Sequence, residues 1–86
     1  MNISISGRNI SISKSQRLLH YRFRIPKNQI AYSRFILESY EGFGIQSTEA
    51  GSDVVTWSFP ESRKEEVESL LQALLNRSEM QNEQSK

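Results

Sequence analysis

The segment Leu18-Leu19-His20-Tyr21-Arg22-Phe23-Arg24-Ile25-Pro26 decides the fold of this chain. Apolar and polar side chains alternate from residue 18 to residue 25, which is the period of a β-strand. One face carries Leu19, Tyr21, Phe23 and Ile25, and the other carries Leu18, His20, Arg22 and Arg24. This pattern predicts a strand with one face on a hydrophobic core and the other face uncovered. Pro26 ends the strand, because proline lacks a ladder donor.

The next segment, residues 28–41, has the pattern of an amphipathic helix. Its apolar face would contain Ile30, Ser33, Ile36, Leu37 and Tyr40. Asn28 is placed to act as the N-cap, and Gly42 is placed to end the helix. We therefore expect this helix to lie on the sheet to which the first strand belongs.

Two further strands are predicted at residues 43–48 and 53–59. The turn-rich segment Glu49-Ala50-Gly51-Ser52 would join them as a hairpin. In the second strand, Val55, Trp57 and Phe59 share one face, and Pro60 closes the strand. The pattern predicts that this face joins the core.

A second helix is predicted at residues 62–77. Ser62 and Glu65 have the spacing of a capping box. A narrow apolar stripe follows, made of Val67, Leu70, Leu71, Leu74 and Leu75. Residues 78–86 are polar, and we expect them to form a disordered tail.

The N-terminal residues 1–16 repeat the sequence Asn-Ile-Ser-Ile-Ser, at 2–6 and at 9–13. Gly7-Arg8 would form a two-residue hairpin turn, so that Ile5 faces Ile10 and Ile3 faces Ile12. All four isoleucines would then lie on one face. The alternative is a flexible, serine-rich tail.

The predicted order is β-α-β-β-α over residues 17–77, preceded by the Ile/Ser segment 1–16. It predicts an α+β fold of the ferredoxin-like type, with an antiparallel sheet and two helices on one face. That fold has a further strand after its second helix, and nothing after Arg77 supplies one. We expect either the N-terminal hairpin or a second subunit to cover the open sheet edge.

The run Phe35-Ile36-Leu37-Glu38-Ser39-Tyr40-Glu41-Gly42, together with Tyr21-Arg22-Phe23-Arg24-Ile25, resembles a bacterial domain family of unknown function. In length and order the region of about residues 20–77 is also similar to small ACT-like regulatory domains. The resemblance implies a regulatory or interaction module that self-associates through its sheet. The turn 26–29 lacks the glycine typical of ACT domains that bind amino acids.

Composition excludes several classes of protein. The chain has 86 residues and no cysteine, so it forms no disulfide and no thiolate metal site, and we expect a cytoplasmic protein. No apolar run is long enough to span a membrane. His20 is the single histidine, and no serine lies in a nucleophile motif. We therefore expect no metal, no cofactor and no enzymatic activity.

Charge is distributed unevenly. Residues 1–37 contain seven Lys or Arg and no acid, whereas residues 38–86 contain four basic residues and all ten acids. The asymmetry indicates an anionic partner or self-complementary association, unless each half only solvates its own surface. The candidate surface for an anion or a partner is formed by Arg17, His20, Arg22, Arg24 and Lys27.

Two functions fit these patterns. The first is a non-catalytic regulatory or protein-interaction module that forms a homodimer or another homo-oligomer. The alternative is a small nucleic-acid-binding protein that uses the basic N-terminal half. His20 is either a surface residue or a pH-sensitive contact.

Overall fold

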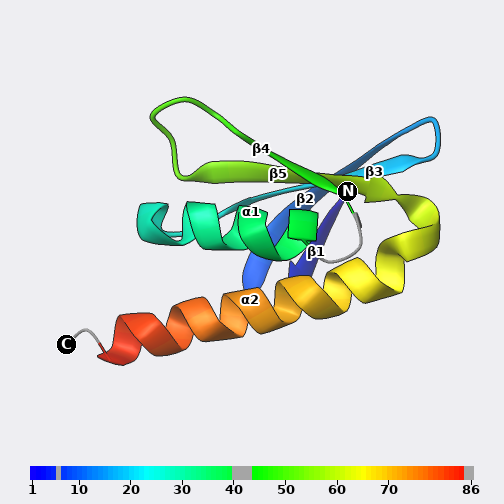
Figure 1. Cartoon of the computed structure of the whole chain (residues 1–86). Helices are drawn as coiled ribbons and strands as arrows, with labels where there is room; N and C mark the ends of the chain where they lie inside the picture. The colour runs from blue at the N-terminus through cyan, green and yellow to red at the C-terminus, as the bar shows by residue number, and fades with distance from the viewer. Residues whose placement is uncertain (6, 40–43, 85–86) are drawn as a thin grey trace.

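The protein folds into one five-stranded antiparallel sheet and two α-helices (Figure 1). The computed structural model describes residues 1–5, 7–39 and 44–84, with side chains as far as Arg77. The strands are β1 (Asn2–Ile5), β2 (Arg8–Ser15), β3 (Leu18–Arg24), β4 (Ile45–Thr48) and β5 (Val54–Pro60). The helices are α1 (Ile30–Ser39) and α2 (Lys64–Gln84), and each follows a short 3-10 turn, η1 (Lys27–Gln29) or η2 (Glu61–Arg63).

The strand order in the sheet is β1-β2-β3-β5-β4. β3 is central, and the connection through α1 passes over β5 to reach β4 at the far edge. The N-terminal hairpin occupies the position beside β3, where the sequence predicted an open edge. The prediction that this hairpin covers the edge is confirmed, and β1 becomes the outer strand on that side.

The register of the hairpin differs from the predicted one. Ile3 pairs with Ile10 and Ile5 pairs with Arg8, so the predicted facing of Ile5 with Ile10 and of Ile3 with Ile12 is wrong. Gly7 has φ +78° in the connection between Ile5 and Arg8. Glycine is favoured at the second position of a turn that needs a positive φ there. Gly7 therefore takes the second position and not the first, and the strand pairing is shifted by two residues from the predicted pairing. Because strand side chains alternate with period two, this shift leaves all four isoleucines on the core face.

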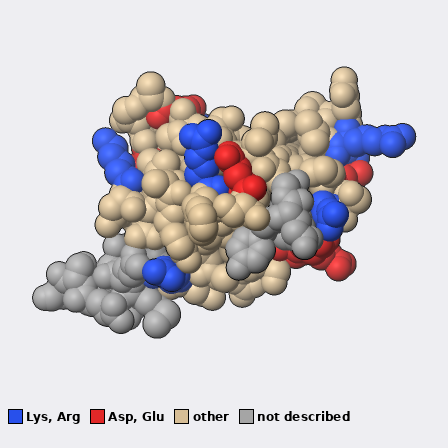
Figure 2. All heavy atoms as spheres, in the orientation of Figure 1, with Lys and Arg blue, Asp and Glu red and all other residues tan. Residues whose placement is uncertain are grey.

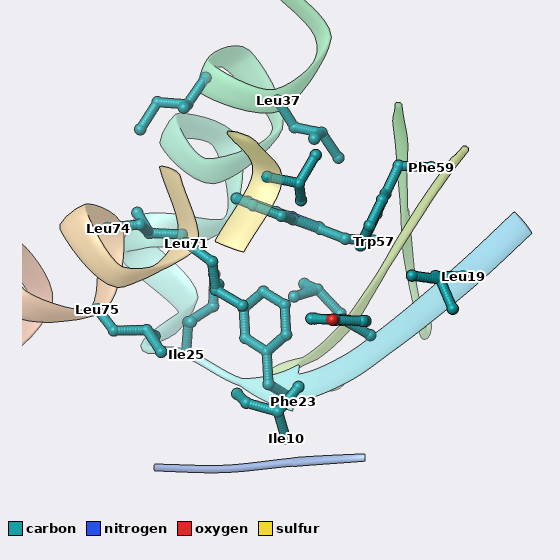
Figure 3. Packing of buried hydrophobic residues seen from close by; sticks show 14 residues of the cluster. Ile10, Leu19, Phe23, Ile25, Leu37, Trp57, Phe59, Leu71, Leu74 and Leu75 are labelled. Atoms are coloured by element: carbon teal, nitrogen blue, oxygen red, sulfur yellow. The ribbon is translucent and has the colours of Figure 1, made fainter. Parts of the chain in front are cut away.

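The core lies between the sheet and the helices, which both pack on the same face (Figures 1 and 3). β3 contributes Leu19, Tyr21 and Phe23, and β5 contributes Val55, Trp57 and Phe59, as their alternation predicted. The helices contribute the following buried residues: Ile36, Leu37, Val67, Leu71, Leu74 and Leu75. Tyr21 meets Phe59, and Phe23 meets Trp57, in edge-to-face geometry with centroids 4.9 and 5.5 Å apart.

The first helix begins differently from the prediction. Asn28 lies inside η1, whose N-cap position is Pro26, so Asn28 does not cap the helix. Proline suits that place, since a helix start leaves backbone N–H groups without partners in any case. The expected face is buried at Ser33, Ile36 and Leu37. The predictions for Tyr40 and Gly42 fall outside the described residues.

The second helix also departs from its predicted limits. Ser62 lies within η2, so it is not the N-cap of α2 and the capping-box prediction is wrong. α2 continues past Arg77 to Gln84, so the segment expected to be a disordered tail is helical as far as residue 84. Polar residues with good helix propensity extend a helix whose preceding turns are already held by packing. No helix within the described residues is long and apolar enough to cross a membrane.

Candidate functional site

The outer face of the sheet, opposite the helices, is polar and carries many hydroxyl groups. Cross-strand pairing places Ser11, Arg22, Thr56 and Ser47 in one row across β2, β3, β5 and β4. A second row contains Ser13, His20, Ser58 and Ile45. The core aromatic side chains point away from this face and are buried. Among the described residues, the outer face therefore offers hydrogen bonds and charge but no aromatic platform on which a base could stack.

The predicted surface residues lie in three different places. His20, Arg22 and Arg24 project from the outer face of β3, as expected. Arg17 precedes β3 and Lys27 follows it in η1, so the seven residues of β3 and two further residues, Ile25 and Pro26, separate these two positions. At about 3.3 Å per residue, the two ends are roughly 20 Å apart, and the five side chains do not form one cluster.

Acidic side chains of the β4–β5 hairpin already contact the basic strand. Arg22 Nη2 lies 3.1 Å from Glu49 Oε1, and Arg24 Nη1 lies 2.9 Å from Asp53 Oδ1. On the face shown in Figure 2, Lys and Arg side chains are dispersed, and several stand beside acidic ones. The charge asymmetry along the chain is thus partly balanced in space. The nucleic-acid hypothesis stays a prediction.

His20 is held by two serine hydroxyls. Its Nε2 is 2.7 Å from Ser15 Oγ, and its Nδ1 is 2.8 Å from Ser58 Oγ. A hydroxyl can donate or accept, so both the neutral and the charged imidazole can keep these two bonds. These contacts link His20 of β3 to Ser15 of β2 and Ser58 of β5, so the ring has a structural role on this face.

A pocket opens where the sheet divides, and we call it the fork pocket. β2 pairs with β3 only from Ser11↔Arg22 to Ser15↔Leu18, although both strands extend further. Residues 8–10 remain paired with β1, and residues 23–24 remain paired with β5. In Figure 1 the blue hairpin turns toward α2 while β3 continues toward α1. The space between them is a pocket of about 370 Å³ lined by Arg8, Asn9, Ser11, Arg22, Phe23, Arg24 and Val54.

The fork pocket joins two predicted residues to three that sequence reasoning missed. Arg22 and Arg24 were candidates, whereas Arg8, Asn9 and Ser11 were assigned only to the hairpin. The strand alternation puts Arg8 on the same face as Ile10, yet its Nη1 reaches the Arg24 carbonyl oxygen at 3.4 Å. Opening of the β2–β3 ladder lets this side chain enter the gap, and no local sequence pattern signals such an opening.

The two edges of the sheet differ in accessibility. At β4, the Gln46 N–H donates to Glu38 Oε2 of α1 at 3.1 Å, so a helix side chain occupies this edge donor. The hydrogen bond from the Gln46 N–H is the main cause that lowers the pKa of Glu38 below its usual range, and the Arg34 guanidinium is a smaller one. The carboxylate therefore stays ionised at neutral pH and keeps the Gln46 N–H of the β4 edge occupied.

The β1 edge has no such block among the described residues. Met1 and Ile12 exchange two backbone hydrogen bonds, of 2.7 and 3.2 Å. Because antiparallel pairing alternates, Asn2 and Ser4 direct their N–H and C=O groups away from β2, toward the free edge. β1 contains no proline and no charged side chain, which are the usual protections of an edge strand. Its Ile3 and Ile5 are only partly buried.

The described residues offer little that would hold a metal. No group of three or more His, Asp or Glu side chains gathers within the described part of the chain. Tyr21 Oη donates a short hydrogen bond to Glu68 Oε2, and the tyrosine pKa is raised, first by burial and then by this carboxylate. A phenol that resists ionisation is suited to packing and hydrogen bonding.

Comparison with known proteins places the chain in a family without assigning it an activity. No curated protein and no solved structure gives a match. A family model described as a domain of unknown function (DUF4911) matches residues 23–77, which is more than half of the chain. The matched region runs from the end of β3 into α2 and leaves the N-terminal hairpin and most of β3 outside. The chain belongs to the DUF4911 family of domains of unknown function.

Proposed function

We propose that this chain is a non-catalytic interaction module that self-associates through its sheet, by pairing β1 with the β1 strand of a second copy. The observation that carries the proposal is the open, uncharged β1 edge beside partly buried isoleucines. In this proposal the chain acts as a homodimer in the cytoplasm and has no enzymatic activity of its own.

The architecture supports this proposal. β3, β4 and β5 with the two helices follow the order of a ferredoxin-like or ACT-like domain, in which β4 and β3 flank β5. β2 stands where the last strand of that fold would lie. β1 then extends the sheet beyond the ferredoxin-like core and presents its free edge to a partner.

The sequence of β1 is suited to pairing with itself. In an antiparallel pair, directly opposite residues point to the same face of the sheet. A two-fold pairing centred near Ser4 would place Ile3 or Ile5 opposite an isoleucine of the second copy. The same pairing would place serine and asparagine side chains together on the outer face. The result is a ten-stranded sheet with a continuous apolar layer across the seam.

The other edge favours β1 as the site of association. Glu38 and α1 already occupy the Gln46 N–H of β4. A second copy approaching β4 would have to displace this carboxylate, which is also bonded to Arg34 at 3.3 Å. β1 requires no such displacement.

Light scattering at increasing concentration tests the proposal, with Ser4→Pro and Ser4→Ala as the paired variants. Ser4→Pro removes a donor that faces the free edge and leaves the β1–β2 bonds of Ile3 and Ile5 in place. We expect wild type and Ser4→Ala to be dimers at micromolar concentration, and Ser4→Pro to be a monomer with unchanged circular dichroism. Ile5→Lys, which brings a charge to the seam, should also weaken the dimer.

Two results would overturn the proposal. One is a wild-type monomer at concentrations of about 1 mM, which corresponds to negligible affinity. The other is a folded Ser4→Pro variant that dimerises as tightly as Ser4→Ala, because the β1 edge would then not be the interface.

A further inference from the structure

We propose that the fork pocket is a binding site for a small phosphate-bearing anion, held by Arg8, Arg22 and Arg24 with Asn9 and Ser11. The site lies on the opposite side of the hairpin from the free β1 edge, and it does not depend on self-association. Three features support this site: the charge of the lining, the unused donors of Arg8 and the size of the gap.

The lining of the pocket is strongly unbalanced in charge. Its seven residues include three arginines and no acid. Arg22 and Arg24 have carboxylate partners in Glu49 and Asp53, but both ion pairs are largely exposed. Exposed ion pairs are weak and screened by salt, so an anion of higher charge can compete with these carboxylates.

Arg8 has unused hydrogen-bonding capacity. No ion pair forms between Arg8 and an acid of the described residues, and its Nε is buried without an acceptor there. Among the described residues, its guanidinium makes a single long contact, of 3.4 Å, to the Arg24 carbonyl oxygen. A guanidinium carries five N–H donors, and burying one of them, here Nε–H, without an acceptor is unfavourable. A ligand with several acceptor oxygens would satisfy them.

The side chains that line the pocket are of the types that bind a phosphoryl group. Guanidinium groups bind phosphate oxygens in a fork geometry and, unlike lysine, bind through paired donors. Asn9 and Ser11 add neutral donors from the hairpin side of the gap. Arg8 comes from β2, on one side of the gap, and Arg22 and Arg24 come from β3, on the other side. An anion in the gap would therefore bridge the two strands where their pairing has ended.

The size of the pocket indicates a small ligand. Its volume of about 370 Å³ is near the lower end for sites that take small molecules. Phe23, the one aromatic residue in the lining, is buried, so a nucleic-acid base finds no stacking surface. A single phosphorylated metabolite fits these features better than a polynucleotide backbone.

Nuclear magnetic resonance with the full chain tests the site directly. Amide shifts would be followed while inorganic phosphate or pyrophosphate is added at constant ionic strength, with sodium acetate as the comparison. We expect saturable shifts at Asn9, Ser11 and Arg24, stronger binding of pyrophosphate, and no saturation with acetate. Shifts spread evenly over the chain, or no saturation with either phosphate, would overturn the proposal.

Matched arginine variants test the assignment. Arg8→Gln should weaken pyrophosphate binding about tenfold or more, whereas Arg17→Gln, at the other end of β3, should change it less than about twofold. Equal effects of the two variants would overturn the site.

A gain of affinity provides a test that does not depend on damage to the fold. Asp53→Asn removes the carboxylate that competes for Arg24, so pyrophosphate should bind severalfold more tightly. Unchanged or weaker binding by this variant, when it is folded, would contradict the proposal.

Binding of a single-stranded oligonucleotide distinguishes a site for a small phosphate ligand from a surface for a nucleic-acid backbone. We expect it to bind no more tightly than pyrophosphate does. Tighter binding that Arg17→Gln and Arg8→Gln weaken equally would replace the small-ligand site by an extended nucleic-acid surface.

Discussion

Gln46 Oε1 accepts a hydrogen bond from the indole Nε1 of Trp57 at 2.8 Å, and both side chains are buried. Ser33 Oγ lies 2.7 Å from the same oxygen, and Gln46 Nε2 donates to the Ile30 carbonyl oxygen at 3.1 Å. One amide therefore joins β4, β5 and α1 inside the apolar core. A polar side chain is tolerated this deep in the core because its hydrogen-bonding groups have partners.

Replacing this amide should destabilise the protein strongly. Gln46→Leu leaves the buried indole N–H without an acceptor, and we expect a loss of about 2–3 kcal/mol in the free energy of unfolding. Urea unfolding followed by far-ultraviolet circular dichroism measures the loss. Ser47→Ala, on the exposed side of the same strand, should change stability by less than about 0.5 kcal/mol.

A second substitution shows whether the hydrogen bond is the cause. Trp57→Phe removes the donor, so Gln46→Leu should cost less in that background than in the wild type. Equal costs in both backgrounds would assign the loss to packing of the glutamine side chain.

The same amide shows where prediction from sequence stops. The alternation in residues 18–25 and 54–59 reports a local period, and it correctly predicted that Leu19, Tyr21 and Phe23 of β3 and Val55, Trp57 and Phe59 of β5 are buried. Val54 was expected on the uncovered face with Thr56 and Ser58, yet it is also buried. Gln46 is tolerated on the core face because its amide has hydrogen-bond partners there. These partners lie 11 to 16 residues away in the sequence. No local pattern reports such partners, so sequence reasoning did not single out this residue.

The candidate site was predictable to a similar extent. The charge of Arg22 and Arg24 and their place on the uncovered face follow from composition and strand period. The ion pairs with Glu49 and Asp53 depend on how the β4–β5 hairpin folds over β3. The entry of Arg8 into the fork pocket depends on the end of the β2–β3 ladder. Both are tertiary features, and they decide which arginines can meet a ligand.

Gly44 should not tolerate a side chain. A Cβ atom added there would lie 2.9 Å from Phe59 Cβ and closer still to the Ser58 carbonyl oxygen of the β5 backbone. Neither group can move freely, because β5 is held between β3 and β4. We expect Gly44→Ala to lower stability by about 1–3 kcal/mol, measured by urea unfolding.

Gly51 provides the comparison for this substitution. It has φ +70° and nothing within 4 Å of an added Cβ, so Gly51→Ala is affected by backbone conformation alone. Its cost should be about 1 kcal/mol, and Gly51→Asn should recover part of it, since asparagine tolerates positive φ. Rescue of Gly44 by asparagine would contradict the steric explanation.

The hydrogen bond from Tyr21 to Glu68 predicts how stability responds to alkaline pH. Burial, and then the carboxylate, raise the pKa of Tyr21 in the folded protein, whereas the unfolded chain ionises near pH 10. Below that pH both states bind the phenolic proton, and Tyr21 makes no pH-dependent contribution. Above it, ionisation stabilises only the unfolded state, so the free energy of unfolding should fall as pH rises.

Tyr21→Phe separates this effect from other titrations. The variant should lose about 1–2 kcal/mol at pH 7, because the hydrogen bond is missing. Between pH 9 and about 11.5 its stability should decline less steeply than that of the wild type, because phenylalanine has no proton to lose. Glu68→Gln should retain most of the wild-type slope, since burial is the first cause of the raised pKa. Identical slopes for wild type and Tyr21→Phe would show that the buried tyrosine ionises as readily in the folded protein as in the unfolded chain.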